Sequence, residues 1–442
     1  MEAIKDTFTK SKKKKVKAVH QKVKVFRVHD PKMAVLMWGV THSVSQLSHV
    51  PQQVMLLKDD FKAYSKIKID NHFYNKEHMP GHFKFKEYMP LVFRNLRERF
   101  AIDEKLYAAS FLIQPQLSKA QGNSGAKFLL TTDKRFYIKT LQSVEVEMMH
   151  HIMPSYHRYI VESHSDTLLP QYLGMYRTTL DNKEYYYLVV RSVFSCKKKV
   201  QKKYDLKGSR IDREAKDSEK DKESVTFKDN DFTKENARIF IGAEQKEKFK
   251  DRLTKDVNFL SGLNIMDYSL LVGIHDTEHV DSSEPEDEQD GEGPDGGTTG
   301  DESGDGLEEP ASPTTDGETS AATPETLAAR RQRYSRTESV SSSDGYESEY
   351  FALPSSDESL HSVYYMGIID VLTYYGATKK AAHAAKTVKH GVLNIKRRST
   401  SEPNMPNMKL SMEFNKAGAE ISTVKPHLYA TRFLEFMDSV ME

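Results

Sequence analysis

An acidic stretch in the second half of the chain limits what the whole sequence can fold into. Between Glu278 and Glu309 fourteen residues are Asp or Glu and none is Lys or Arg, and Ser, Thr and Pro remain frequent to about Ser359. Such a composition buries too little apolar surface to offset the entropy that is lost on ordering. We therefore expect residues 278–360 to form a disordered acidic and Ser-rich insertion.

Core-like sequence lies on both sides of this insertion. After it, apolar residues return in Val363–Leu372, and Leu428–Met437 has the spacing of an amphipathic helix. The insertion therefore interrupts one domain instead of linking two. The 442 residues, of which 38% are hydrophobic, are enough for a two-lobed enzyme.

The remaining composition excludes several classes of protein. The single cysteine, Cys196, rules out an internal disulfide framework and a cysteine-based zinc site, which favours a reducing compartment. No apolar run approaches the roughly 18 residues that a membrane span requires, so a membrane would be reached from outside. Residues 1–27 contain the lysine run Lys12–Lys15 and are expected to be a basic tail.

Local periodicity predicts a helix and an antiparallel sheet before the insertion. Phe93–Phe100 places apolar residues at i, i+3 and i+7, which is the spacing of an amphipathic helix. Two β-rich runs between Ala126 and Leu141 flank a turn signal at Thr132–Lys134, and Tyr185–Val190 is a further candidate strand.

Two glycine patterns are candidates for a phosphate-binding loop. Gly291–Gly296 matches G-x-G-x-x-G literally, but its acidic neighbours would repel a phosphate and no strand precedes it. Gly122-Asn-Ser-Gly125 precedes the predicted strand pair, and its glycines would let backbone N–H groups approach phosphate oxygens. A surface hairpin turn explains this second pattern equally well.

Three charged residues are candidates for phosphoryl-transfer chemistry. Lys139 lies in a predicted strand, from which its ammonium group can reach between nucleotide phosphates. Asp267 is surrounded by apolar residues, where an unpaired charge is costly, and Asp370 follows an apolar run as a strand-end metal ligand would. An exposed strand lysine, a structural aspartate and a turn aspartate are the respective alternatives.

Longer blocks of the sequence resemble the phosphatidylinositol phosphate kinase family. The resemblance runs from about Val23 to Met441 outside the insertions, with signature blocks at Tyr204–Ser209, Thr226–Phe232 and Ile265–Leu271. Other blocks are similar to the type II branch, whose members are phosphatidylinositol 5-phosphate 4-kinases. These blocks are Trp38–Val40, Asp59–Lys68, Asn230 and Lys379–His390.

The resemblance implies roles for individual residues. It makes Lys139 the ATP phosphate-binding lysine, Asp267 the catalytic carboxylate and Asp370 the magnesium ligand. Lys207 would meet the transferring phosphate as a further catalytic residue, and the strand end at 191–194 would border the adenine. The full set expected to bind the nucleotide is Gly122, Gly125, Lys139, Arg191, Val193 and Phe194.

Further residues would govern the lipid substrate. Ala382 occupies an activation-segment position where the type I branch has glutamate, so it would select phosphatidylinositol 5-phosphate. Lys228 and Asp229 belong to a family block with a supporting role. The lysines expected to contact substrate and an anionic membrane are Lys379, Lys380, Lys386 and Lys389.

The implied fold is α+β: a two-lobed lipid-kinase fold with an antiparallel sheet and helices in the N-lobe and a smaller mixed C-lobe. Residues 28–277 would form the first part of the kinase domain and residues 361–442 the second, with an activation segment at 379–424. The implied reaction transfers the γ-phosphate of ATP, with Mg²⁺, to the 4-position of phosphatidylinositol 5-phosphate. The resemblance also implies a homodimer without nucleic acid, in the cytoplasm and peripheral on the cytoplasmic face of the plasma or internal membranes. The nucleus is a further candidate compartment.

Departures from the family pattern leave alternatives open. Val190 and Ser192 stand where the type II branch usually has Thr and Asn, which leaves the choice between ATP and GTP undecided. Residues 392–416 interrupt a junction that the family usually makes directly, and Arg397–Thr400 within them is phosphoacceptor-like, so this loop is either an electrostatic membrane switch or a neutral extension. The alternative functions are a phosphatidylinositol 4-phosphate 5-kinase and a weakly active phosphoinositide-binding scaffold. A protein kinase is disfavoured because the sequence has no His-Arg-Asp, Asp-Phe-Gly or Ala-Pro-Glu motif.

Overall fold

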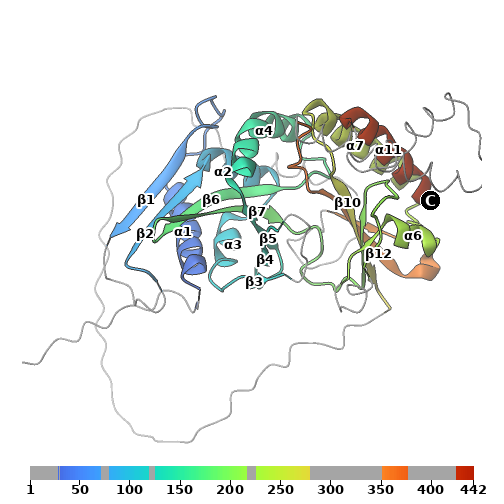
Figure 1. Cartoon of the computed structure of the whole chain (residues 1–442), viewed down its shortest axis with the longest axis horizontal. Coiled ribbons are helices and arrows are strands. Elements are labelled where there is room, and N and C mark those ends of the chain that lie inside the picture. The colour runs from blue at the N-terminus through green and yellow to red at the C-terminus, as the bar shows by residue number, and fades with distance from the viewer. Residues whose placement is uncertain are drawn as a thin grey trace, which may run out of the picture. The chain divides into compact units, whose positions relative to one another are not determined.

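The computed structural model describes residues 28, 30–70, 79–118, 125–216, 225–278, 351–376 and 425–442 (Figure 1). Within these ranges the chain forms two β-sheets, each with its own helices. The predictions for the basic tail, for most of the acidic insertion and for the activation segment lie outside the described residues.

The first sheet has seven antiparallel strands in the order β1-β2-β6-β7-β5-β4-β3. Its turns follow from local sequence: Asp181 and Asn182, at φ 48° and 61°, form the two-residue hairpin between β6 and β7. The turn signal at Thr132–Lys134 joins β4 to β5. The strands are β1 (Tyr64–Asp70), β2 (His82–Tyr88), β3 (Gln116–Leu117), β4 (Phe128–Leu130), β5 (Phe136–Leu141), β6 (Tyr172–Leu180) and β7 (Lys183–Arg191).

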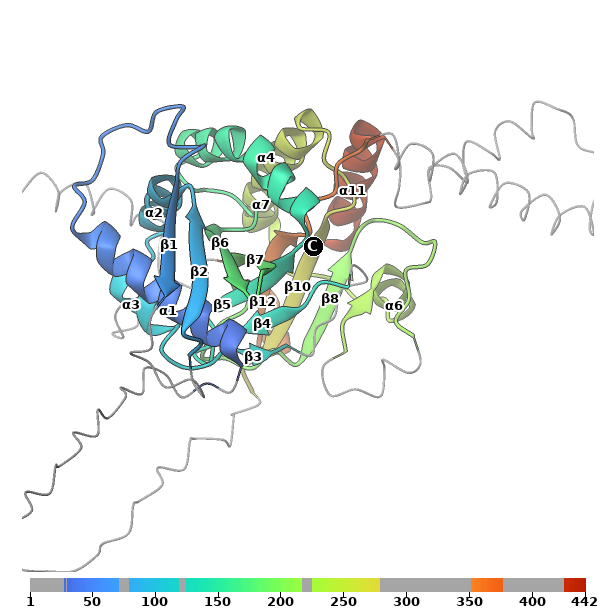
Figure 2. The same ribbon diagram turned by 60° about the vertical axis from the view of Figure 1, so that its left-hand side comes forward.

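Helix α1 packs against β2 and β6 of this sheet (Figure 2). Its N-terminus is capped by Asp30, whose carboxylate accepts a hydrogen bond from the backbone N–H of Lys32 at 2.9 Å. Gly39 allows the close approach to β2, because a Cβ at this position would lie 2.0 Å from Cδ2 of Phe85. The helices of this part are α1 (Pro31–Ser48), α2 (Pro90–Arg99), α3 (Glu104–Ala109) and α4 (Ser143–Glu162).

The second sheet has five strands in the order β11-β12-β10-β8-β9 and is mixed, because β8 and β9 are parallel while the other pairs are antiparallel. Helices α7 and α11 pack side by side in this part (Figure 1). Its strands are β8 (Lys202–Leu206), β9 (Phe227–Lys228), β10 (Ser269–Asp276), β11 (Ala352–Pro354) and β12 (Ser362–Ile369). Its helices are α6 (Asp229–Lys234), α7 (Ala243–Gly262), α11 (Pro426–Val440) and the 3₁₀ turn η1 (Glu358–Leu360).

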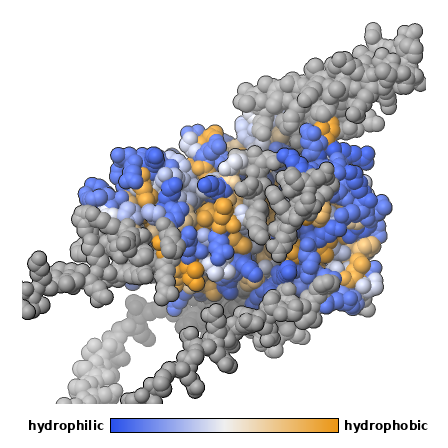
Figure 3. Space-filling model, turned by 60° about the horizontal axis from the view of Figure 1, so that its bottom comes forward, coloured by the Kyte–Doolittle hydropathy of each residue, from blue (hydrophilic) through white to orange (hydrophobic). Residues whose placement is uncertain are grey.

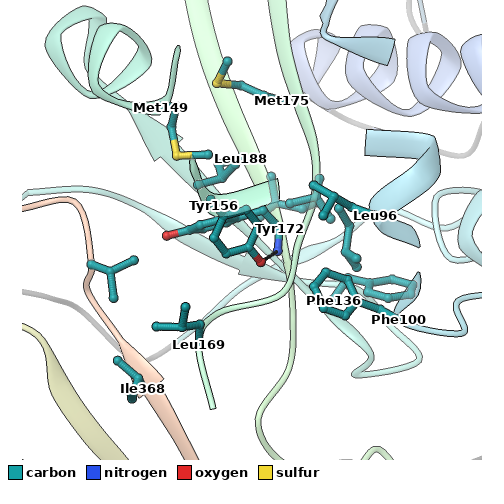
Figure 4. Close-up of a cluster of buried hydrophobic side chains, with 14 of the residues drawn as sticks. Leu96, Phe100, Phe136, Met149, Tyr156, Leu169, Tyr172, Met175, Leu188 and Ile368 are labelled. Atoms are coloured by element: carbon teal, nitrogen blue, oxygen red, sulfur yellow. Dashed lines mark hydrogen bonds between the residues drawn. The ribbon is translucent and has the colours of Figure 1, made fainter. Parts of the chain in front are cut away.

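A shared hydrophobic core joins the two sheets. In Figure 4, Tyr156 and Tyr172 lie between Leu188 of the first sheet and Ile368 of the second. The hydroxyl of Tyr156 donates a hydrogen bond to the carbonyl oxygen of Pro170 at 2.6 Å, so the buried ring is also held at its polar end. On the face shown in Figure 3, hydrophobic residues occur in small groups between hydrophilic ones.

The α+β class, with an antiparallel first sheet and a smaller mixed second sheet, is confirmed. The expected end of the insertion at residue 360 is wrong, because regular structure already includes β11 and η1. Phe351 is buried, and its carbonyl oxygen accepts a hydrogen bond from the N–H of Met366 on β12. A three-residue edge strand has no hydrophobic period of its own, so Ser-rich surroundings concealed it.

Candidate active site

Two aspartates lie where strands of the second sheet begin and end. Asp370 follows β12 directly, and one residue, Tyr268, separates Asp267 from the start of β10. Because β10 and β12 are antiparallel, with Ser269 opposite Ile369, these two strand termini are neighbours. Both aspartates adopt positive φ, 62° for Asp370 and 66° for Asp267. Aspartate tolerates this region better than most residues, and such conformations gather at functional sites.

Lys207 comes to the same edge from the neighbouring strand β8. It follows Leu206, which pairs with Leu270 on β10. Its Nζ lies 2.7 Å from the carbonyl oxygen of Asp267 and 2.9 Å from Oδ1 of the same residue. Both side chains are mostly buried, at 12% and 24% exposed, so this ion pair is less screened than one on the surface.

A second carboxylate network fixes the backbone around Lys207. The N–H groups of Lys207 and Gly208 donate to Oδ1 of Asp229 at 2.9 and 2.7 Å. Arg213 bridges this aspartate to Asp205, with 2.7 Å to Asp229 Oδ2 and 2.7 Å to Asp205 Oδ1. Burial alone would raise the pKa of Asp205, but the positive charges of Arg213 and Lys207 bring that pKa below its usual value.

Lys139 reaches the site from β5 in the first sheet. Its Nζ lies 3.1 Å from Oε1 of Glu145 in the first turn of α4, and the two side chains are 12% and 21% exposed. Oε2 of Glu145 accepts a hydrogen bond from the backbone N–H of Gln142 at 2.8 Å and so caps the helix. Sequence reasoning missed Glu145, although a glutamate three residues after an N-cap is a recognisable helix-start signal.

Electrostatics shows that these groups act on one another. Asp370 is exposed at the strand end, yet protein atoms crowd its carboxyl group, and the resulting loss of hydration raises its pKa. Lys139 and Lys207 oppose that rise, while the negative charges of Asp205 and Asp267 add to it. The two lysines of different sheets therefore face one acidic cluster.

The hydroxyl of Tyr172 lies within the same field. Its pKa is raised first by burial and then by the charges of Asp370 and Glu145. The ring is part of the core that joins the sheets (Figure 4). A packed aromatic side chain thus feels the charges of both the carboxylate that pairs with Lys139 and the strand-end carboxylate.

These carboxylates suit a magnesium ion that is shared with substrate phosphates better than a metal ion held by protein ligands alone. Within the described part of the chain, no group of three His, Cys, Asp or Glu residues is arranged to hold a metal ion. Mg²⁺ is commonly bound by one or two carboxylates together with substrate phosphates and water. Asp370, with Asp267 at the neighbouring strand terminus, fits that pattern, and a cation would relieve the crowding of negative charge there.

The predicted adenine-binding segment links β7 to the second sheet. Val193 packs against the glycine surface of β12, with Cγ2 3.0 Å from the place that a Cβ on Gly367 would take. Phe194 packs likewise against Gly273 of β10, where its Cε1 would lie 2.4 Å from an added Cβ. Arg191 instead contacts the first part of the chain, because its guanidinium donates to the carbonyl oxygen of Phe100 at 3.3 Å.

Of the other predicted site residues, only Gly125 lies within the described ranges. Gly125 has φ 70° and no atom within 4 Å of a Cβ built on it, so its backbone is both unusual and accessible. The predicted residues that lie outside the described ranges are Gly122, Lys379, Lys380, Ala382, Lys386 and Lys389.

The arrangement has the parts of a nucleotide-dependent phosphotransferase: a strand lysine paired with a helix-start glutamate faces two strand-end aspartates across the junction of two sheets. Comparison with known proteins narrows this class. The family model described as Phosphatidylinositol-4-phosphate 5-Kinase matches residues 114–440. The chain therefore belongs to the phosphatidylinositol phosphate kinase family.

Full-length relatives agree with this family. The chain is 47% identical over 434 residues to phosphatidylinositol 5-phosphate 4-kinase type-2 alpha of Gallus gallus, a match that covers 98% of this chain and 97% of that protein. The type-2 alpha protein of Homo sapiens matches over the same shares with 47% identity. The type-2 beta protein of Homo sapiens is 48% identical over 424 residues, or 96% of this chain and 93% of that protein. Among the described residues, no helix has the length and apolar character needed to cross a membrane.

Proposed function

We propose that this chain transfers the γ-phosphate of Mg-ATP to the 4-hydroxyl of phosphatidylinositol 5-phosphate and so produces the 4,5-bisphosphate. The observation that carries the proposal is the convergence of Lys139 and Lys207 on the carboxylates of Asp267 and Asp370. Relatives named for this reaction match nearly the whole chain at 47% and 48% identity, which supports the choice of substrate.

The charges of the site suit the parts of the reaction. The attacking inositol hydroxyl gives its proton to Asp267 while the oxygen of that hydroxyl forms a bond to the γ-phosphorus, and the bond between that phosphorus and the bridging oxygen of ADP breaks. Lys207 contacts Asp267 and places its ammonium group where the transferring phosphoryl group carries negative charge. Lys139, released from Glu145 or shared with it, neutralises phosphate oxygens of the nucleotide.

Asp370, together with Asp267, would hold magnesium. The ion would supply charge neutralisation and orientation of the phosphates. Arg191, Val193 and Phe194 would border the adenine, and the backbone at Gly122 and Gly125 would cover the phosphates. GTP is the alternative nucleotide, which a competition assay between the two nucleotides decides.

The proposal extends to where the enzyme works. The lysines of the activation segment and Ala382 would present phosphatidylinositol 5-phosphate from an anionic leaflet on the cytoplasmic side. A homodimer would form at the first sheet, where β1 is an outer strand with alternating exposed side chains. Light scattering of the purified protein tests the dimer.

A vesicle assay with each monophosphorylated phosphatidylinositol tests the reaction. We expect the 5-phosphate to be the preferred substrate and Ala382→Glu to shift activity toward the 4-phosphate. Asp267→Asn should lower kcat by about 10² to 10⁴, the usual worth of a proton-transfer group. The exposed Asp251 on α7 provides a control, since Asp251→Asn should retain wild-type rates. Retention of most activity by Asp267→Asn, or vesicle binding by a wild type that transfers no phosphate, would refute the assignment and favour a scaffold.

A further inference from the structure

One fully buried carboxylate has no part in the chemistry above. Asp256 is on α7 and is 0% exposed. Its Oδ1 accepts hydrogen bonds from the hydroxyls of Tyr159 at 2.7 Å and Thr167 at 2.6 Å, and its Oδ2 accepts one from the backbone N–H of Leu168 at 2.6 Å. Three hydrogen-bond donors around one buried carboxylate are a specific arrangement and not a chance contact.

The donors come from α4 and the segment after it, which connect β5 to β6 of the first sheet, whereas Asp256 lies on α7 in the second part. Tyr159 lies near the end of α4, whose first turn carries Glu145, the partner of Lys139. Leu168 lies in the segment 163–171 that leads from α4 to β6. Stacking of the Tyr159 ring on Phe259 of α7, with centroids 4.3 Å apart and planes at 15°, reinforces the same joint.

Leu168 continues the connection to the metal-ligand strand. Its carbonyl oxygen accepts a hydrogen bond from the N–H of Ile368 at 2.7 Å, and Ile368 is two residues before Asp370 on the same strand end. Figure 4 shows Leu169, the next residue along the chain, beside Ile368. Asp256 therefore accepts from the N–H of Leu168, and the carbonyl oxygen of the same residue accepts from β12.

Such a group is expensive to keep in the interior. Burial raises the pKa of Asp256 to about 6, although the bonds from Thr167, Tyr159 and Leu168 and the charge of Arg252 oppose that rise. Well-packed apolar residues in the place of buried charges are often neutral or stabilising. Stability alone therefore does not account for a carboxylate at this joint.

We propose that Asp256 is a positioning residue that sets Lys139 and Asp370 at the separation required for phosphoryl transfer. Two arms of contacts start at Asp256. One runs through Tyr159 and α4 to Glu145, the partner of Lys139, and the other runs through Leu168 and Ile368 to Asp370. Because the arms meet at one carboxylate, a change there moves the two halves of the site relative to each other. The importance of that separation for the rate rests on the proposed function. The connection between Asp256 and the two halves of the site rests on the hydrogen bonds alone.

Asp256→Leu is the main test, because leucine has a similar size but cannot accept the N–H of Leu168. Misplacement of reacting groups by about 1 Å costs up to roughly 10²-fold in rate, so we expect kcat to fall about 10- to 100-fold. The Mg²⁺ concentration for half-maximal rate should rise, while KM for the lipid stays within about twofold. Asp251→Asn, an exposed change on the same helix, should leave all three values unchanged.

Asp256→Asn is the conservative rescue. Its Oδ1 can accept from Leu168, and the hydroxyls of Tyr159 and Thr167 can turn to accept from its amide. It should therefore recover most of the rate that Asp256→Leu loses. Tyr159→Phe removes only the α4 arm and leaves the carboxylate in place, so a two- to tenfold loss is expected from one missing bond. If Asp256→Leu does not fold, this variant and the asparagine variant carry the test.

Hydrogen exchange supplies a readout that does not depend on turnover. In Asp256→Leu, peptides that contain the amides of Leu168 and Ile368 should exchange faster than in the wild type and in Asp251→Asn. Faster exchange together with a wild-type kcat would overturn the proposal, and so would a lower kcat with unchanged exchange at Ile368. Full activity of Asp370→Asn would instead contradict the proposed function. The exchange result would then still show that Asp256 is connected through Leu168 to Ile368.

Discussion

The buried glutamate of β2 leads to a prediction about stability against pH. Glu87 is 1% exposed and faces α1, α2 and β6, and its neighbours in this interior are Ser43, Arg97, Glu104, Tyr107 and Tyr176. Arg97 is committed elsewhere, since it donates to Glu104 at 2.7 Å and to the carbonyl oxygen of Leu173 at 2.8 Å. Burial accordingly raises the pKa of Glu87 from 4.5 to about 7, against the attraction of Arg97.

The magnitude follows from linkage. Each pKa unit corresponds to about 1.4 kcal/mol, so ionising Glu87 costs about 3 kcal/mol more in the folded than in the unfolded chain. Because the folded pKa is the raised one, its contribution to stability is fully present below pH 4.5 and is lost as the pH rises through about 7. Glu87→Gln removes this titration. The variant should therefore gain about 3 kcal/mol on the wild type between pH 4 and pH 8.

Urea unfolding at pH 5, 6, 7 and 8 measures the difference directly. The chain has a single tryptophan, Trp38 on α1, whose fluorescence reports on the helix that covers Glu87. Its ring stacks on His42 at 4.8 Å, so circular dichroism should accompany the fluorescence in case His42 quenches it. Glu98→Gln, which neutralises an exposed carboxylate on α2, is the matched control. A difference between Glu87→Gln and wild type that stays constant across this range would refute the reasoning.

Three further perturbations test other parts of the structure. Glu145→Gln should raise KM for ATP several-fold in steady-state kinetics, because Lys139 loses its charged partner while the amide oxygen of Gln can still accept the capping hydrogen bond from Gln142. Gly273→Ala should destabilise the protein by about 1 to 3 kcal/mol and weaken nucleotide binding in calorimetry, because the new methyl group would overlap the ring of Phe194. Deletion of 281–348 should leave the thermal midpoint unchanged, since loop closure costs little, whereas a longer deletion that also removes β11 should lower it.

Local pattern was sufficient for the elements that carry the site. The run that ends at Lys139 reads as a strand, and the apolar run before Asp370 as a strand end, because each signal lies within a few residues. What the pattern left undetermined is which strand termini meet. That depends on pairings between segments far apart in the chain, such as β10 with β8, and β10 with β12 across the insertion, which can be found only in the folded chain.

The buried carboxylates show where sequence reading can go further. On β2, Phe83, Phe85 and Glu87 occupy alternate positions on the inward face, so the glutamate interrupts a period of two. On α7, Asp256 stands among the buried residues Phe249, Leu253, Val257 and Leu260, where a hydrophobic residue is expected.

An acidic residue inside an apolar period is thus a signal of a buried titratable group that can be read without a structure. Its partners cannot be read in the same way. The amide of Leu168 is 88 residues from Asp256 and belongs to a segment with no distinctive composition. Hydrogen-bond geometry therefore decides whether such a group is a liability, as at Glu87, or a joint, as we propose for Asp256. The two cases are separated by what changes: Glu87→Gln gains stability at high pH, while Asp256→Leu loses catalytic rate.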